Sequence, residues 1–216
     1  MTGQAEQLIS DLATDLTPVR PLRPPLLRAA IWLAIAVAIN AIAVALHGLR
    51  PDILSLLKTP SYTMLLAATV LTGLLAAIAV FLISIPGRSP RWALLPVPGL
   101  ILWVASAGYG CLTDWIRMGP EGLALGTSFH CFSWIVGLSL PLSLGLYLMV
   151  RHAAWIRPGL TLTLGMLSTA ALVAAGLSLF HPLDTSLMIL IWHGGSTLLL
   201  VGLSTLGIPL FRPKQL

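Results

Sequence analysis

The stretch YTMLLAATVLTGLLAAIAVFLISI, residues 62–85, contains no charged side chain. A transmembrane helix needs about 20 predominantly apolar residues. Five other windows have this character, so the sequence predicts six spans, at Leu26–Leu46, Tyr62–Ile85, Ala93–Leu112, Phe132–Val150, Gly159–Leu179 and Thr185–Leu206. The runs lack the two-residue alternation of barrel strands. The predicted fold class is therefore all-α integral membrane, a bundle of six transmembrane helices.

Composition supports lipid as the main solvent of the chain. The 216 residues are 57% hydrophobic and only 9% charged, which is more apolar surface than one soluble core uses. The net charge of +5 comes from basic residues in short loops beside apolar segments. There they act as orientation signals and as contacts for membrane lipid, so nucleic acid is not an expected partner.

Basic residues also predict the orientation. One side of the predicted membrane carries Arg20, Arg23, Arg28, Arg88, Arg91, Arg151, Arg157, Arg212 and Lys214, and the other carries Arg50, Lys58 and Arg117. The positive-inside rule then places both termini in the cytoplasm. The chain divides into a leader at 1–25, a six-helix membrane domain at 26–210 and a cytoplasmic tail at 211–216.

Polar and small residues inside the spans predict some packing details. Gly73 and Ala77 on the second span, and Gly108 beside Ala107 on the third, are expected at close helix contacts because small residues let backbones approach. Asn40 in the first span needs a hydrogen-bond partner. Pro141, in the middle of the fourth span, is expected to introduce a kink.

The leader carries an amphipathic pattern from Glu6 to Leu16. Its apolar residues recur at helical spacing, while two acidic residues lie off that stripe. A helix this short is marginal in water, so it is expected to fold against a partner. Its acidic polar face is repelled by anionic lipid, which favours a protein with an apolar groove and a basic rim. The predicted partner-binding residues are Leu8, Ile9, Asp11, Leu12, Asp15 and Leu16.

Cysteine and histidine gather at the opposite side of the predicted membrane. Cys111 lies at the expected outer end of the third span, His130 and Cys131 at the start of the fourth, and His181 in the last outer loop. Thiolates and imidazoles bind soft or borderline metal ions, and the two thiols could alternatively form a disulfide. The spacing matches no standard zinc motif.

His193 lies about 12 Å deep in the sixth span, at 1.5 Å per residue. An intramembrane histidine at that depth is either a functional group or a neutral side chain bonded to a neighbouring helix. We therefore include it among the sensor candidates, whereas His47 and His152 read as ordinary loop residues. No nucleophile–base arrangement or phosphate-binding glycine loop occurs, so neither catalysis nor a resident cofactor is expected, although a metal ion could be a signal.

Several segments of the chain together resemble one known family. They are Leu8–Leu12 followed by Asp15–Leu22, Pro86–Ser89, Gly110–Trp115, His130-Cys131, Phe180–Asp184 and Trp192-His193. The family is that of the NrsF-like (OsrA-like) six-helix membrane anti-sigma factors, which are proteobacterial negative regulators of extracytoplasmic-function sigma factors. The resemblance implies a bacterial inner-membrane protein whose cytoplasmic leader captures a sigma factor. It also implies that Cys111 and Cys131 sense metal or oxidative stress.

Two other functions are compatible with some of these features. A small metal or solute transporter or channel would use His193, Asn40 and Pro141, but the spans show no clear mid-membrane acidic residue and no obvious inverted repeat. A membrane thiol oxidoreductase would have to pass electrons to a second cysteine pair or to a quinone. Two cysteines without a C-x-x-C motif exclude a relay of two pairs.

Overall fold

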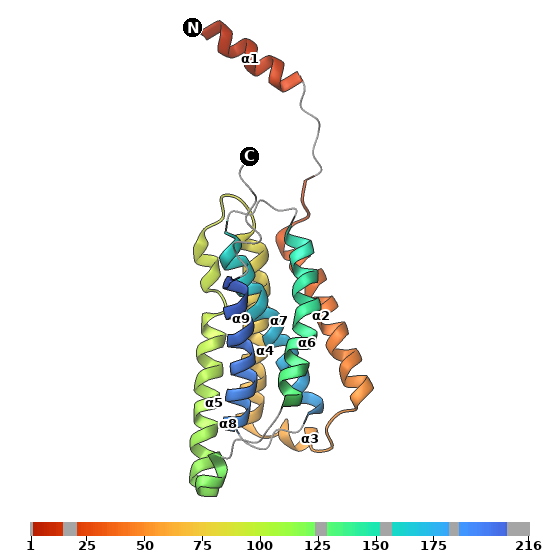
Figure 1. The fold of residues 1–216 in the computed structure, drawn as a ribbon, viewed down its shortest axis with the longest axis vertical. Coiled ribbons are helices and arrows are strands. Elements are labelled where there is room, and N and C mark those ends of the chain that lie inside the picture. Colours follow the sequence, from red (N-terminus) through yellow and green to blue (C-terminus); the bar gives the residue numbers. More distant parts are fainter. Residues whose placement is uncertain (1, 15–20, 124–128, 152–156, 182–185, 207–216) are drawn as a thin grey trace.

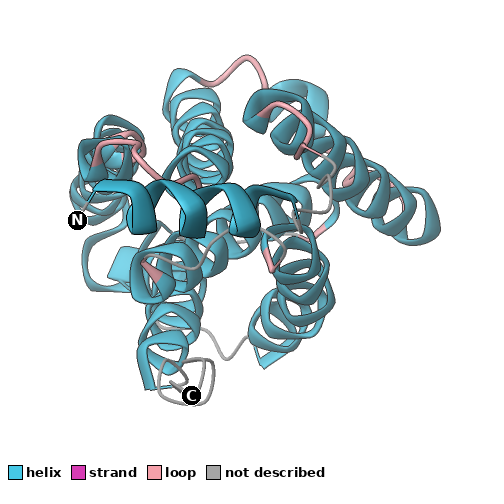
Figure 2. Cartoon of the chain, turned by 90° about the horizontal axis from the view of Figure 1, so that it is seen from above, coloured by secondary structure: helices cyan, strands magenta, loops and turns pink. Residues whose placement is uncertain are grey.

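The computed structural model of the chain describes residues 2–14, 21–123, 129–151, 157–181 and 186–206. Within these ranges it contains helices and loops and no strand (Figures 1 and 2). The helices are α1 (Thr2–Thr14), α2 (Pro25–His47), α3 (Ile53–Leu56), α4 (Pro60–Ile83), η1 (Pro90–Leu94), α5 (Val97–Met118), η2 (Gly119–Leu123), α6 (Phe129–Val150), α7 (Pro158–Phe180), α8 (Ser186–Ile189), η3 (Leu190–Gly194) and α9 (Gly195–Leu206).

Six helical segments are long and apolar enough to cross a membrane. They are Pro25–His47, Pro60–Ile83, Pro90–Gly122, Phe129–Val150, Pro158–Phe180 and Ser186–Leu206. The last is built from α8, the π-helical turn η3 and α9. This architecture is that of a multi-pass membrane protein, and it confirms the predicted all-helical fold with six apolar helices.

The third long helix differs from its predicted bounds. Hydropathy gave Ala93–Leu112, whereas α5 runs from Val97 to Met118. It begins late because Pro90–Leu94 form a separate 3₁₀ turn and Pro98 lies in the first turn of α5, a position that proline favours. It ends late because its last turns carry polar residues that a hydropathy window excludes. Cys111 is therefore inside the helix, about 10 Å before its end.

Helices α4 and α7 form the centre of the bundle, because they are the most buried of the long helices and make the most extensive contact with each other. Their contact is close because Gly73 of α4 lies against the side chain of Leu172 of α7. Ser168 of α7 donates a hydrogen bond of 2.7 Å to the Gly73 carbonyl. Small residues thus bring two backbones together where lipid supplies no hydrophobic drive for association.

The predicted packing positions are right on the second span and wrong at one point of the third. Gly73 and Ala77 are buried in α4 and Ala107 is buried in α5. Gly108 is exposed, and a Cβ added there would have no neighbour within 4 Å. The helix contact on α5 is made by Gly99, where an added Cβ would lie 2.9 Å from the Thr72 backbone nitrogen of α4.

Asn40 and Pro141 are both accommodated inside long helices. The Asn40 side chain donates a 2.9 Å hydrogen bond to the Ala36 carbonyl of its own helix and lies directly against Gly176 of α7. Asn40 therefore lies at the contact between α2 and α7. Pro141 lies within α6, which is a continuous helix from Phe129 to Val150.

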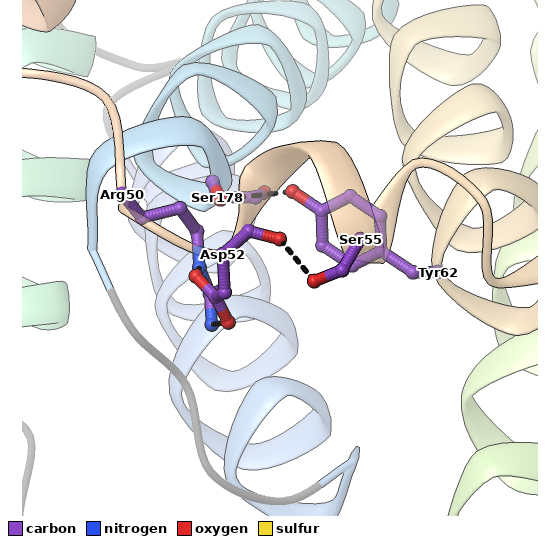
Figure 3. Close-up of polar contacts among 5 residues, drawn as sticks. All are labelled: Arg50, Asp52, Ser55, Tyr62 and Ser178. Atoms are coloured by element: carbon purple, nitrogen blue, oxygen red, sulfur yellow. Dashed lines mark hydrogen bonds and ion pairs between the residues drawn. The ribbon is translucent and has the colours of Figure 1, made fainter.

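The connection from α2 to α4 lies at the end of the bundle away from the leader (Figure 1), where it is fixed against the end of α7 (Figure 3). Arg50 bonds both carboxylate oxygens of Asp52, at 2.6 and 2.7 Å, and its backbone N–H donates to the Leu179 carbonyl at 3.0 Å. The Tyr62 hydroxyl donates to the Ser178 carbonyl at 2.9 Å. These bonds hold the α2–α4 connection to α7.

The ion pair between Arg50 and Asp52 predicts a small acid sensitivity. The hydrogen bond from Arg50 lowers the pKa of Asp52 below its usual 3.8. A carboxyl group with a lowered folded-state pKa stabilises the fold above its unfolded pKa, and this contribution is lost as the pH falls through the folded-state value. We expect Asp52→Asn to reduce the loss of thermal stability between pH 7 and pH 3. Equal losses in both proteins would contradict this role.

Candidate functional site

The first candidate site is the leader helix α1. It stands clear of the bundle and is joined to α2 through residues 15–24 (Figure 1). The large apolar side chains Leu8, Ile9 and Leu12 are 60%, 65% and 62% exposed, and Asp11 is exposed beside them. These four predicted binding residues therefore lie on one accessible helix. Asp15 and Leu16, the other two, lie outside the described residues.

The root of the leader is anchored in the bundle by Arg28, in the first turns of α2. Its side chain is 6% exposed, donates a hydrogen bond to the Met149 carbonyl of α6, and lies 5.3 Å from the ring centroid of Phe81 of α4. The sequence suggested only an orientation signal here. In the structure the Arg28 side chain contacts both α4 and α6. The start of α2, which is covalently joined to the leader, is therefore also packed against the bundle.

The second candidate site lies at the opposite end of the bundle, where α2, α6 and α7 meet. His47 of α2 stacks on Phe180 of α7 with ring centroids 5.2 Å apart and contacts Trp134 of α6 edge-on at 4.7 Å. His130 of α6 and His181, directly after α7, have ring centroids 5.2 Å apart. We call these five residues, His47, His130, Trp134, Phe180 and His181, the histidine–aromatic cluster.

A hydrogen bond orients the His130 ring in this arrangement. The Trp134 indole N–H donates to His130 Nε2 at 2.9 Å. An indole nitrogen is only a donor, so His130 Nε2 is the acceptor of this bond. Trp134 therefore contacts both His47 and His130 within the cluster.

The two cysteines lie on helices with different neighbours. Cys111 is half-buried on α5, which packs against α4, α8 and η2. Cys131 is fully buried in the first turn of α6, which packs against α2, α7, η3 and α9. Neither cysteine is in a disulfide. In the ranges that the structure describes, no group of three His, Cys, Asp or Glu side chains is placed to hold a metal ion.

The sixth span lies between the two cysteine-bearing helices (Figure 1). Next to Cys111, an added Cβ on Gly110 would collide with Ser186, and Asp114 accepts a 2.8 Å hydrogen bond from the Ser186 N–H. Asp114 thus caps the start of α8 from a neighbouring helix. On the other side, α6 contacts the π-helical turn η3 and α9. Both cysteine helices therefore contact one shared element.

His193 lies in the π-helical turn of this shared element. It is 4% exposed, and its Nε2 atom has no hydrogen-bond partner among the described residues. Single π-helical turns inside α-helices are frequent at functional sites. The structure therefore brings His130 and His181 together and places His193 in the π-helical turn of the sixth span. Cys111 and Cys131 lie on α5 and α6, the two helices that contact that span.

Comparison with known proteins identifies the family of the chain. The family model described as NrsF, negative regulator of sigma F, matches residues 12–212. The chain belongs to the NrsF family. No curated protein and no solved structure matches the chain. The NrsF family is one of regulators and not of enzymes, and its name implies a sigma factor as partner.

The structure of this NrsF family member also corrects one expectation from the sequence. The position of His47 predicts an ordinary loop residue, but His47 ends α2 and its ring contacts Trp134 and Phe180. Hydropathy located His47 and Phe180 at the same side of the membrane, yet it gave no signal for the rotation of their helices. The role of Asp114 as a cap for α8 could not be predicted from its position in the sequence.

Proposed function

We propose that the chain is a membrane-bound anti-sigma factor that sequesters an extracytoplasmic-function sigma factor through α1. The observation that carries this proposal is the exposed apolar stripe of Leu8, Ile9 and Leu12 on a helix outside the bundle. Three large apolar side chains at helical spacing are the anchors by which an amphipathic helix occupies a groove. The NrsF family name supplies the class of partner.

The charge distribution supports a cytoplasmic position for α1. Arg23, Arg28, Arg88, Arg151 and Arg157 belong to the bundle end that carries the leader, and Arg50, Lys58 and Arg117 belong to the opposite end. The positive-inside rule assigns the arginine-rich end to the cytoplasm of a bacterial inner membrane. The leader is then on the side where sigma factors are found, and the histidine–aromatic cluster faces the periplasm.

Co-purification tests the capture proposal. The full chain and a variant lacking residues 1–22 are isolated from native membranes, and retained proteins are identified by mass spectrometry. We expect a sigma factor with the full chain and none with the shortened one, because the shortened chain keeps all six long helices. Recovery of the same sigma factor with both would place binding elsewhere, and recovery with neither would contradict the proposal.

The sensing part of the proposal assigns the signal to the periplasmic end. Soft metal ions or oxidants react with thiolates, and the two thiols lie on the helices that enclose the sixth span. A change at Cys111 or Cys131 is then passed to η3 and to α2, which leads to the leader. A hundredfold change in partner affinity needs about 2.7 kcal/mol of coupling.

Cysteine variants provide the test of sensing. We expect Cys111→Ser and Cys131→Ala to hold the sigma factor normally and to release less of it under metal or oxidant stress, measured with a sigma-dependent reporter. Ser133→Ala is the matched control, since it changes an exposed side chain in the same first turns of α6. Normal release by both cysteine variants would rule out a thiol sensor.

A further inference from the structure

An apolar groove lies between α6, α7 and α9, in the half of the bundle nearer the leader. Its volume is about 330 Å³, within the range of small-molecule sites. Leu140, Leu144 and Val150 line it from α6, Gly165 from α7, and Leu200 and Leu203 from α9. The groove is separate from the histidine–aromatic cluster, which lies at the other end of the same helices.

The length of the groove matches one leaflet of a bilayer. From Leu140 to Val150 it follows ten residues of α6, about 15 Å at 1.5 Å per residue. The hydrocarbon core of a bilayer is about 30 Å thick. Thr161, near the start of α7, and Ser204, near the end of α9, line the same half. The groove therefore spans the depth of the leaflet on the leader side.

The serine and threonine hydroxyl groups in the groove wall are bonded within the protein. Ser143 forms a 2.9 Å hydrogen bond with Thr169 of α7, Ser204 donates to the Val201 carbonyl at 2.7 Å, and Thr161 donates to the Arg157 carbonyl at 3.0 Å. These groups do not need a polar ligand. The groove thus offers leucine, valine and methionine surface to an occupant, which is the chemistry of an acyl chain.

The mouth of the groove is basic. Arg151 directly follows the groove residue Val150, and Arg157 directly precedes α7 and donates a 3.1 Å hydrogen bond to the Arg88 carbonyl. The connections 84–96 and 151–157 contain no Asp or Glu in the sequence. The positive charge of these arginines complements an anionic headgroup at the depth where phosphates lie.

We propose that the groove binds one acyl chain of an anionic phospholipid, with the phosphate against Arg151 and Arg157. The leaflet-length apolar wall selects a lipid tail, and the arginines at its mouth select the charge of the headgroup. A lipid in this position contacts α6, α7 and α9 together. It holds α6, whose first turn contains His130 and Cys131, against α7 and α9.

Native mass spectrometry of the full chain in detergent tests this proposal, with phosphatidylglycerol and phosphatidylcholine as probes. We expect one saturable phosphatidylglycerol molecule per chain, bound at least about tenfold more tightly than phosphatidylcholine. Leu203→Trp fills the groove and should weaken binding about tenfold. Leu198→Trp is its matched control, because Leu198 is exposed on the same helix and does not line the groove.

A second pair of variants tests the headgroup contact. Arg151→Gln with Arg157→Gln should remove the preference for phosphatidylglycerol and leave tail binding in place, whereas Lys58→Gln at the opposite end should change nothing. Equal binding of both lipids by the unaltered chain would overturn the proposal. So would equal effects of the two tryptophan variants, or a change of oligomeric state with Leu203→Trp alone, which would make a second copy of the chain the occupant.

Discussion

Replacing Leu12 with Asp is expected to weaken sigma-factor binding about 100-fold, which corresponds to about 3 kcal/mol. Leu12 lies on the exposed apolar stripe of α1 together with Leu8 and Ile9. An apolar anchor in a partner groove is desolvated on binding, so a carboxylate in its place loses the contact and brings an unpaired charge into an apolar site. Binding of the purified sigma factor to the full chain in nanodiscs gives the affinity directly.

Gln7→Asp is the matched control for this prediction. It adds the same charge to the same helix, but residue 7 lies off the stripe at 100° per residue. We expect the affinity of Gln7→Asp to stay within about threefold of the original, because rim charges contribute little to affinity. If Gln7→Asp and Leu12→Asp weaken binding equally, the effect is one of net charge and the stripe is not the binding surface.

Gly99→Ala is expected to have the largest effect on the stability of the bundle. An added Cβ would lie 2.7 Å from the Thr72 hydroxyl, 2.9 Å from the Thr72 nitrogen and 3.1 Å from its Cα. Two of these atoms are backbone, so a side-chain rotation cannot accommodate the added methyl group. Helix α5 would have to move away from α4. Overpacking of this kind typically costs about 1–3 kcal/mol. Thermal unfolding in one detergent should show a lower midpoint.

Gly108→Ala on the same helix is the control for this loss of stability. Gly108 is exposed and has no neighbour for an added Cβ within 4 Å. Alanine is a better helix former than glycine by about 1 kcal/mol, so the unfolding midpoint should be unchanged or higher. A midpoint for Gly99→Ala as high as that for Gly108→Ala would contradict the close approach of α4 and α5.

The existence and length of the long helices could be predicted because hydropathy reports burial in lipid. The bounds of α5 could not, since a hydropathy window stops at Leu112 where the helix continues through Asp114 and Arg117. Hydropathy measures preference for lipid and not helix propensity, so the window excludes polar residues that are still helical. The helix ends at Met118, before Gly119, whose φ is positive.

The candidate sites could be predicted only in part, for a related reason. Topology placed His130 and His181 at one end of the bundle, and the structure brings their rings to 5.2 Å. Neither the order of helices around the bundle nor their rotation is encoded in hydropathy. His47 was therefore missed, and nothing in the sequence indicated that the sixth span lies between the helices of Cys111 and Cys131. The apolar stripe of the leader could be predicted because it depends only on the spacing of apolar residues within one short helix.

In vitro transcription shows whether α1 keeps a sigma factor from RNA polymerase. Sigma factor, core polymerase and a sigma-dependent template are combined with the full chain in nanodiscs, either unaltered or carrying Leu12→Asp. We predict that the unaltered chain stops transcription and that Leu12→Asp leaves most of it. Transcription that continues with the unaltered chain, or that both proteins inhibit equally, would contradict sequestration by the leader helix.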